Sequence, residues 1–487
     1  MRARTPIALL AALAAAALAL GQEAGPTLSL DDAIRLALGR NKDLKVVSYG
    51  RGISRALLLV ARGRFDPAIV ANRSAYDYAE QLTPGFAQVY TIKEDVYSLG
   101  LGGQTPFGTT YSFSASVTND RYSYAPGNNY LTFGGFQVTQ PLLKNFGFGA
   151  NLENVRIAKA NRAISDLQYQ QSAIDTVTSV IIAYSNLQLA HDVLDAARRS
   201  RDAAASLLEA NEKEYKVGAI SQSDVTTARF NVASQQEAIL VSERTVRDRQ
   251  NQLRELIGDD VFLEDEPLFV LAPMQVPDVS VNLRADLARA LAQRPDYLQA
   301  RLGIAKNRAV EAAARNAVLP ELDFVGGYGY NGLGSTLSAS RAMVEQRDNP
   351  SYSAGLQVTI PLTFSVGRGN LRAARLQRQQ SEEDLRRLEA DIAVNVASAA
   401  GQIDTTKKRV VADREAYALA KQALDAEEKK KLVGTSTTLA VVQQQQFVST
   451  QEVNVSIALA SERQAVAVYD QQLGATLERY HIKLASE

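Results

Sequence analysis

The sequence predicts a mixed α and β membrane protein, in which a transmembrane β-barrel continues into a long α-helical coiled-coil barrel. Three observations predict this class. Two segments carry an apolar residue at every second position, and two pairs of helical runs are far longer than a compact domain can hold. The same order of helices and strands occurs twice within the 487 residues, which indicates an internal two-fold sequence repeat.

The composition excludes several classes of function. Basic and acidic residues number 53 each, so the charge does not favour a nucleic acid or an acidic partner. The absence of cysteine excludes thiol catalysis, disulfides, cysteine-ligated metals and a lipid anchor on an N-terminal cysteine. His191 and His481 are single histidines on helical stretches, where a structural role is expected. Because no polar residues converge on one motif, the sequence predicts no enzyme, metal or cofactor site.

The first residues predict a secretory signal peptide over residues 1–21. Two arginines precede an apolar run from Ile7 to Leu20, and Gly21 completes a stretch of small residues suited to cleavage. No other window of about 18 residues is continuously apolar, so a spanning helix is not expected. The mature protein is therefore expected to leave the cytoplasm and to cross a membrane, if it crosses one, by strands.

Residues 65–142 and 318–364 are expected to form strands of a barrel. Tyr97, Leu99 and Leu101 alternate with serine and glycine, and similar alternation recurs through both segments. One apolar face and one face of small polar residues is typical of a lipid-facing strand, although a soluble β-sandwich shows the same alternation. Eleven of the 19 tyrosines lie in the two segments, as an interfacial aromatic girdle requires, and this favours the membrane.

The lengths of the two segments predict six strands per chain. The segment from Pro67 to Pro141 is longer than the segment from Pro320 to Pro361 by enough residues to form one more hairpin. Strands of the first segment are expected near 68–79, 95–105, 109–119 and 131–141. Residues 81–94, 120–130 and 331–351 are expected to be external loops, because barrels keep short turns on the periplasmic side. The alternative is four strands, with the extra hairpin folded as a loop or plug.

Helices are expected over residues 28–64, 150–258, 281–317 and 368–480. The run from Asn151 to Lys216 contains no proline and would extend about 100 Å at 1.5 Å per residue. Leu167, Ile174 and Ile181 recur every seven residues, which predicts left-handed supercoiling against neighbouring helices. Val217-Gly218 and Val433-Gly434 are expected to reverse the two long runs in tight turns.

The second half of the chain repeats the first without a gap. Leu283, Leu287, Asp296 and Pro320 follow Leu30, Ile34, Asp43 and Pro67 at one constant offset. Such collinear matches indicate duplication of one unit, a helix followed by strands and a helical hairpin. Residues 259–280, which contain three prolines, are expected to connect the halves and to hold at most a short strand or helix. Residues 481–487 are expected to form a C-terminal tail.

These features together resemble the TolC-type outer membrane efflux proteins. The resemblance rests on LSLDDAIRLAL with NKDL, the prolines that open each strand segment, the QPLL step and the paired turns YKVGAISQSDV and LVGTSTTLAV, and it covers nearly all of residues 28–480. It implies a homotrimer in outer-membrane lipid whose helices cross the periplasm. It also implies export through the bore, with an inner-membrane pump and a periplasmic adaptor (membrane fusion) protein as partners. Three copies would supply eighteen strands, whereas the strands of one chain are too few to close a water-filled barrel.

The tips of the two helical hairpins are the candidate site for adaptor docking and for the gate. This site comprises Val217, Gly218, Ser223, Asp224, Lys431, Val433, Gly434 and Thr435. In the family, an aspartate after the first turn engages an aromatic residue before the second, and Asp224 and Lys431 occupy these positions here. This departure predicts a substitute latch, an Asp224–Lys431 ion pair. The alternative is that Asp224 only caps its helix, as Ser221 and Ser223 also could, while Lys431 is solvated.

Other patterns carry weaker signals. Residues 327–332 match G-x-G-x-x-G, but no helix or βαβ unit follows, so a dinucleotide site is not expected. The glutamate pairs 382–383 and 427–428 are expected on solvated helix faces, and glutamines 443–446 would either line a bore or form a polar stripe. The alternative overall function is a secreted trimeric coiled-coil adhesin. The sequence does not distinguish a drug, a metal or a protein as the cargo.

Overall fold

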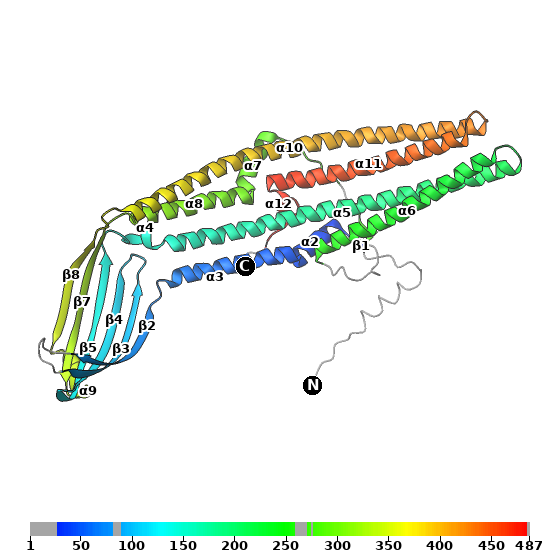
Figure 1. Cartoon of the computed structure of the whole chain (residues 1–487). Helices are drawn as coiled ribbons and strands as arrows, with labels where there is room; N and C mark the ends of the chain where they lie inside the picture. The colour runs from blue at the N-terminus through cyan, green and yellow to red at the C-terminus, as the bar shows by residue number, and fades with distance from the viewer. Residues whose placement is uncertain (1–26, 81–88, 259–269, 274–275, 485–487) are drawn as a thin grey trace, which may run out of the picture. The chain divides into compact units, whose positions relative to one another are not determined.

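The structure is a computed structural model that describes residues 27–80, 89–258, 270–273 and 276–484 (Figure 1). The chain divides into two units. The helical unit comprises Met1–Ser48, Gln168–Pro295 and Glu389–Glu487, and the sheet unit comprises Tyr49–Leu167 and Asp296–Leu388. The predicted signal peptide and most of the predicted connector lie outside the described residues.

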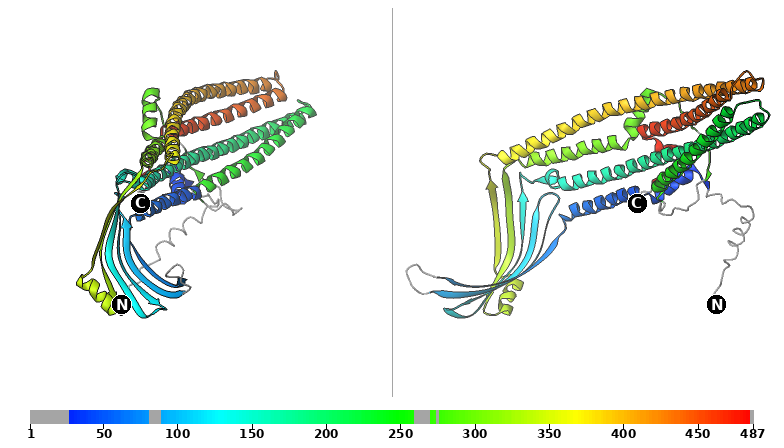
Figure 2. Two further views of the ribbon diagram at one scale, coloured as in Figure 1. Left: turned by 60° about the vertical axis from the view of Figure 1, so that its left-hand side comes forward. Right: turned by 45° about the vertical axis from the view of Figure 1, so that its right-hand side comes forward.

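The sheet unit is built on one antiparallel sheet of six strands in the order β2-β3-β4-β5-β7-β8 (Figure 2). The strands are β2 (Ala68–Glu80), β3 (Tyr90–Gln104), β4 (Thr110–Tyr122), β5 (Ala125–Pro141), β7 (Glu321–Gly334) and β8 (Pro350–Thr359). Four strands come from the first predicted segment and two from the second. The prediction of six strands per chain is therefore confirmed, and the extra hairpin belongs to the sheet instead of forming a loop or plug.

The register separates the side chains of the sheet into two faces. Leu101, Phe113, Phe136 and Tyr328 lie directly opposite one another across four strands, on what we call the apolar face. The ring centroids of Phe113 and Phe136 are 6.1 Å apart, a distance at which aromatic rings attract. Intervening positions such as Ser114 point to the opposite, small-residue face, because side chains alternate along a strand. The predicted alternation is confirmed.

The strands continue beyond the apolar runs from which they were predicted. Residues 120–130, expected to be an external loop, belong mostly to β4 and β5. Polar side chains pair across the extended strands, as in the 2.7 Å contact between Arg121 and Asp95. Apolar alternation could not reveal these polar extensions. The expected loop 81–94 lies partly in β3 and partly outside the described residues.

The expected external loop 331–351 contains a helix, α9 (Leu337–Gln346). Thr336 begins this helix by accepting a hydrogen bond from the Ala339 N–H at 3.3 Å, and Arg347 ends it in the left-handed conformation at φ 61°. Both ends are thus capped by side chain or backbone, which allows a helix of only three turns to persist. The sequence did not predict this helix, and the strands β7 and β8 extend into the two ends of the expected loop.

Both halves of the repeat begin with a broken helix, where one continuous helix was predicted. The pairs are α2 (Leu30–Arg40) with α3 (Lys42–Gly63), and α7 (Leu283–Gln293) with α8 (Pro295–Asn316). At the first break, Asn41 accepts a hydrogen bond from the Leu44 N–H and donates one to the Leu256 C=O, each at 2.9 Å. At the second, Arg294 donates to the Gln472 C=O at 3.1 Å. Each break therefore ties the chain to a neighbouring helix.

The two predicted hairpins are α5 (Glu153–Lys216) with α6 (Gln222–Ile257), and α10 (Ser365–Leu432) with α11 (Thr438–Leu473). The short helices α4 (Gly147–Asn151) and α12 (Thr476–Arg479) precede the first hairpin and follow the second. The last helix was expected to reach residue 480, but Gly474 ends α11 in the left-handed conformation at φ 70°. None of the helices in the described ranges combines the length and the apolar content needed to cross a bilayer.

The core of the helical unit lies along the middle of α5. Ile174 and Ile181 are fully buried there, as the seven-residue spacing predicts, whereas Leu167 is half-buried. Tyr184, also fully buried, places its hydroxyl 3.0 Å from the Leu28 C=O and 2.9 Å from the Ala272 C=O. It thereby joins β1 (Thr27–Leu28) to β6 (Val270–Leu271), two short parallel strands. One strand of the pair comes from the predicted connector, where a short strand or helix was the expectation.

Replacing Tyr184 by Phe is expected to lower the free energy of unfolding by about 1–3 kcal/mol, because the hydroxyl contact with the Leu28 and Ala272 carbonyls is lost. Thermal and urea unfolding of the detergent-solubilised protein, followed by circular dichroism, would measure the change. Tyr215→Phe is the matched control, since Tyr215 is 45% exposed. Equal stability of the two variants would contradict the role given to the Tyr184 hydroxyl.

Candidate functional site

The first hairpin tip is a tight, glycine-dependent turn. Gly218 lies in the left-handed region at φ 78°, and its N–H donates to the Tyr215 C=O at 2.9 Å. The Ala219 N–H closes a second turn by donating to the Glu214 C=O at 2.9 Å. Glycine adopts this conformation without the steric cost that a β-carbon brings, so the end of α5 is fixed by the sequence.

The second tip repeats this geometry, as the duplication predicts. Gly434 has the same φ of 78°, and its N–H donates to the Lys431 C=O at 3.0 Å. The Thr435 N–H donates to the Lys430 C=O, also at 3.0 Å. Thr437 then caps α11 by accepting from the Ala440 N–H. The predicted tip residues of each hairpin thus form one compact turn.

Asp224 acts as part of a helix cap within the chain. Ser221 is the N-cap of α6, and its hydroxyl accepts from the Asp224 N–H at 3.3 Å. The Asp224 carboxylate accepts in return from the Ser221 N–H at 3.2 Å and from its hydroxyl at 2.7 Å. This reciprocal arrangement is a capping box. Ser223, the other candidate cap, lies inside the first turn of α6.

Lys431 bridges the two hairpins instead of being solvated. Its Nζ lies 2.8 Å from Asn211 Oδ1 and 3.5 Å from Glu214 Oε2, and its side chain is only 14% exposed. Asn211 is fully buried and donates from Nδ2 to the Thr438 hydroxyl at 3.3 Å. Within one chain, therefore, the acidic partner of Lys431 is Glu214 and not Asp224. A buried polar network of this kind fixes the register of the helices that carry it.

Asn211 and Glu214 were missed at the sequence level, although one signal was available. Asn211 follows Ala197 and Ala204 at intervals of seven, and both alanines are buried. An asparagine at a buried heptad position specifies helix pairing at a cost in stability. The partner of Lys431 could not be found this way, because it depends on how the two hairpins lie side by side.

A second polar contact holds the end of α10. The Glu427 carboxylate accepts from the Ser436 hydroxyl and lies 3.0 Å from Lys430 Nζ. These two donors, Ser436 first, lower the pKa of the Glu427 carboxyl. The expectation that Glu427 is merely solvated was wrong, since its side chain is 19% exposed and closes the turn.

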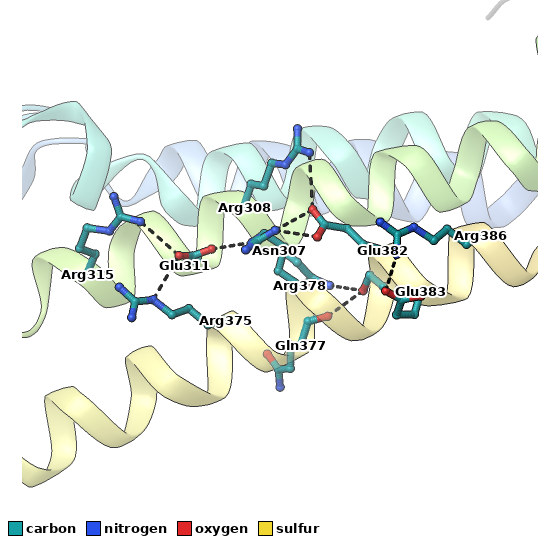
Figure 3. Close-up of polar contacts among 11 residues, drawn as sticks. Asn307, Arg308, Glu311, Arg315, Arg375, Gln377, Arg378, Glu382, Glu383 and Arg386 are labelled. Atoms are coloured by element: carbon teal, nitrogen blue, oxygen red, sulfur yellow. Dashed lines mark hydrogen bonds and ion pairs between the residues drawn. The ribbon is translucent and has the colours of Figure 1, made fainter.

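The sheet unit has its own polar cluster, where α8 faces α10 (Figure 3). Glu311 is 11% exposed and accepts from Arg378 at 2.7 Å, with Arg315 at 3.2 Å and Arg375 at 3.5 Å. Arg378 also donates to both carboxylate oxygens of Glu382 at 2.7 Å. Glu382 is therefore a structural partner and not the solvated residue that its sequence context suggested.

The surface of the tips is suited to binding. The side chains of Val217, Leu432 and Val433 are 74–83% exposed at the turns, which suits contact with another protein. The polar groups beneath them pair with one another. Within the described ranges, no three His, Asp or Glu side chains gather in a way that would hold a metal ion.

Comparison with known proteins gives one consistent family. A family model described as outer membrane efflux protein matches residues 33–259 and 287–475, the two halves of the repeat. The outer membrane protein TolC of Escherichia coli (strain K12) is 24% identical over 353 residues, which cover 70% of this chain and 68% of that protein. TolC of Vibrio cholerae serotype O1 is 23% identical over 387 residues, with 78% and 86% covered.

The solved structures agree on the fold. The outer-membrane channel OprN aligns with a TM-score of 0.69 at 15% identity, over 92% of this chain and 90% of that one. At such low identity the likeness shows the fold alone. The mixed helical and sheet content of the chain is thus that of the TolC-type channels.

Lys431→Met is expected to weaken the contact between the hairpins by about 1–3 kcal/mol, because Asn211 loses a charged hydrogen-bond partner in a half-buried site. Faster amide hydrogen exchange at the ends of α5 and α11 would report it. Lys430→Met is the matched control, since that side chain is 59% exposed. If both variants exchange at the wild-type rate, the Lys431 bridge contributes nothing to hairpin pairing.

Acid is expected to destabilise the sheet unit through Glu311. The hydrogen bond from Arg378 lowers the pKa of this carboxyl below its ordinary 4.5. The ionised group therefore stabilises the fold above that value, and the contribution disappears as the pH falls through the folded-state pKa. Glu311→Gln should lower Tm at neutral pH, and its difference from wild type should shrink between about pH 5 and about pH 3.

The exposed Glu383, at 69%, supplies the control for this titration through Glu383→Gln. A constant difference between Glu311→Gln and wild type across the same pH range would show that the carboxylate charge of Glu311 is not what stabilises the cluster.

Proposed function

We propose that this chain, which belongs to the outer membrane efflux protein family, is the outer-membrane exit duct of a tripartite efflux or type I secretion system. The observation that carries the proposal is the combination, in one duplicated chain, of an apolar-faced six-stranded sheet with two long helical hairpins. Strands with an apolar face suit a bilayer, and long helices with polar surfaces suit the periplasm.

The edges of the sheet support assembly as a homotrimer. β2 and β8 end the strand order, so each has one edge that pairs with no strand of the same chain. An open edge in lipid leaves backbone groups without partners, and closing the sheet into a barrel removes the edge. Three copies, each contributing six strands, would form an eighteen-stranded barrel wide enough for a water-filled bore.

The exposure of the apolar face supports its contact with lipid. Leu99, Phe113 and Leu356 are 57%, 53% and 66% exposed on this face. Residues 65–142 and 318–364 would accordingly form the barrel and its external loops, with the small-residue face lining the bore. Residues 28–64, 150–258, 281–317 and 368–480 would form the periplasmic helical barrel.

The hairpin tips are the surface that suits a periplasmic adaptor. Val217, Val433 and Leu432 present exposed aliphatic side chains on turns whose backbones are fixed by Gly218 and Gly434. Rigid turns that carry apolar side chains bind a partner with little loss of conformational entropy. Ser223, Asp224 and Thr435 would provide the polar rim. The inner-membrane pump would reach the duct through this adaptor.

The contacts beneath the tips also suit a gate. Lys431 joins α10 to α5 through Asn211 and Glu214, so movement of one hairpin relative to the other must break this contact. A few polar contacts hold a closed state only weakly, which allows a partner to release it.

A secreted adhesin is not supported, because the family match extends over both halves of the duplication. Reconstitution into planar lipid bilayers tests the duct directly. We expect ion-conducting channels from protein that migrates as a trimer by native mass spectrometry. Protein that remains monomeric and non-conducting in lipid would overturn the proposal.

If the contact beneath the tips is part of a gate, its removal should change the open probability of the channel. Lys431→Met should raise the open probability of the reconstituted channel severalfold, because the contact with Asn211 and Glu214 is lost, while Lys430→Met should not. Asp224→Ala should cost about 1 kcal/mol of helix capping and leave the open probability near the wild-type value. An unchanged open probability in Lys431→Met would exclude this bridge from the gate.

A further inference from the structure

The helix α9 packs on the apolar face of the sheet. Ser340, in the middle of α9, is fully buried, donates from its hydroxyl to the Gly332 C=O at 3.1 Å and contacts the Thr132 hydroxyl. Thr132 lies opposite Val117, which lies opposite Tyr97, so the helix shares a face with the aromatic side chains of the sheet.

Glycines make this close approach possible. A β-carbon on Gly332 would come within 1.8 Å of the Ser340 carbonyl oxygen, and one on Gly334 within 2.8 Å of the Ser340 nitrogen. On the neighbouring strand, a β-carbon on Gly134 would meet Val344 at 3.3 Å. The backbone of α9 packs directly against the backbone of β7, so the position of the helix on the sheet is defined by close contacts.

A groove runs from α9 across the neighbouring strands. Its cavity of about 730 Å³ falls within the size range of small-molecule sites. Leu99, Ala115 and Val117 form an apolar floor, and Arg341, Val344 and Glu345 of α9 form one wall. We call it the α9 groove. The three aliphatic side chains of the floor suit contact with an acyl chain.

Two arginines border the α9 groove. Arg73 lies over the ring of Tyr97, at 5.5 Å from its centroid, and no acidic partner for it occurs among the described residues. Arg341 donates from Nε to Glu345 at 2.7 Å, and both side chains remain largely exposed. The border of the groove therefore has two positive charges and one negative charge, which favours an anionic group beside an aliphatic chain.

The same face becomes charged just beyond the groove. Along β3, Leu101, Leu99 and Tyr97 are followed on this face by Asp95 and Lys93. Asp95 pairs with Arg121 at 2.7 Å, and Lys93 pairs with Asp77 at 3.3 Å. Charged rows do not lie in hydrocarbon, so the α9 groove lies where the apolar band gives way to the headgroup region.

We propose that the α9 groove binds a phosphorylated lipid of the outer membrane, with one acyl chain on the apolar floor and the phosphate between Arg73 and Arg341. The proposal rests on the proposed function, because it needs this face to meet lipid. Arginine suits a phosphate because its planar guanidinium donates two parallel hydrogen bonds. Glu345 weakens the site by its negative charge and thereby keeps the lipid exchangeable.

Native mass spectrometry of the detergent-purified trimer tests the site with two probes, dioleoylphosphatidic acid and dioleoylphosphatidylcholine. The wild type should retain the phosphatidic acid at concentrations where phosphatidylcholine dissociates. Arg73→Gln and Arg341→Gln should each weaken phosphatidic acid binding about fivefold, as expected for one basic residue beside an anionic lipid. Glu345→Gln should strengthen it, because a repulsive charge is removed and Arg341 is released.

Arg244→Gln is the matched control, since Arg244 is 84% exposed on α6, outside the sheet. Equal retention of the two lipids, an equal loss in the control, or weaker binding in Glu345→Gln would each overturn the proposal. Bilayer conductance of the same preparations distinguishes failure of the lipid site from failure of the proposed function as an exit duct. Conducting trimers without preference for phosphatidic acid refute the lipid site alone, whereas an absence of conducting trimers refutes the proposed function.

Discussion

A backbone donor or acceptor left unpaired in hydrocarbon costs several kcal/mol, and this constraint governs how the chain is built. The six-stranded sheet satisfies its inner strands but leaves one edge of β2 and one of β8 open. Together with an exposed apolar face, these edges make a single copy incomplete in a membrane. The extra hairpin, β3 with β4, keeps the same alternation as the other strands, so it enlarges the sheet without breaking the pattern that a bilayer requires.

The helical unit solves a different problem, which is to keep very long helices in register. A regular heptad of aliphatic residues along α5 gives burial but little registration, since similar side chains recur every second turn. Polar residues supply the registration at defined points. Asn41 and Arg294 anchor the helix breaks, Tyr184 joins the two short strands, and Asn211 with Lys431 fixes the hairpins near their tips. Each of these contacts joins segments that are far apart in the sequence.

The departures from prediction share a physical cause. Apolar periodicity indicates which residues are buried or face lipid, so it predicted the strands and the long helices. It did not predict the strand ends near Arg121, because these ends are polar. Helix α9 was missed because its closest contact with the sheet is between backbones, at Gly332 and Ser340. A glycine in a strand indicates that another segment comes close, but the sequence does not show which segment it is. Within the chain, Lys431 meets Glu214, whereas the Asp224 carboxylate accepts hydrogen bonds from Ser221 in the capping box of α6.

The sequence by itself determined the class of this protein, its duplication, its six strands, the heptad face of α5 and the two glycine turns, because each of these follows from local spacing or from a conformation that only glycine adopts readily. The tertiary structure alone decided which charged groups meet. Three arginines surround the Glu311 carboxylate. Lys431 contacts Asn211 and Glu214 of the other hairpin. Helix α9 lies on the apolar face near Arg73. Such contacts depend on the lateral placement of elements distant in sequence, and periodicity along one element carries no information about its neighbour.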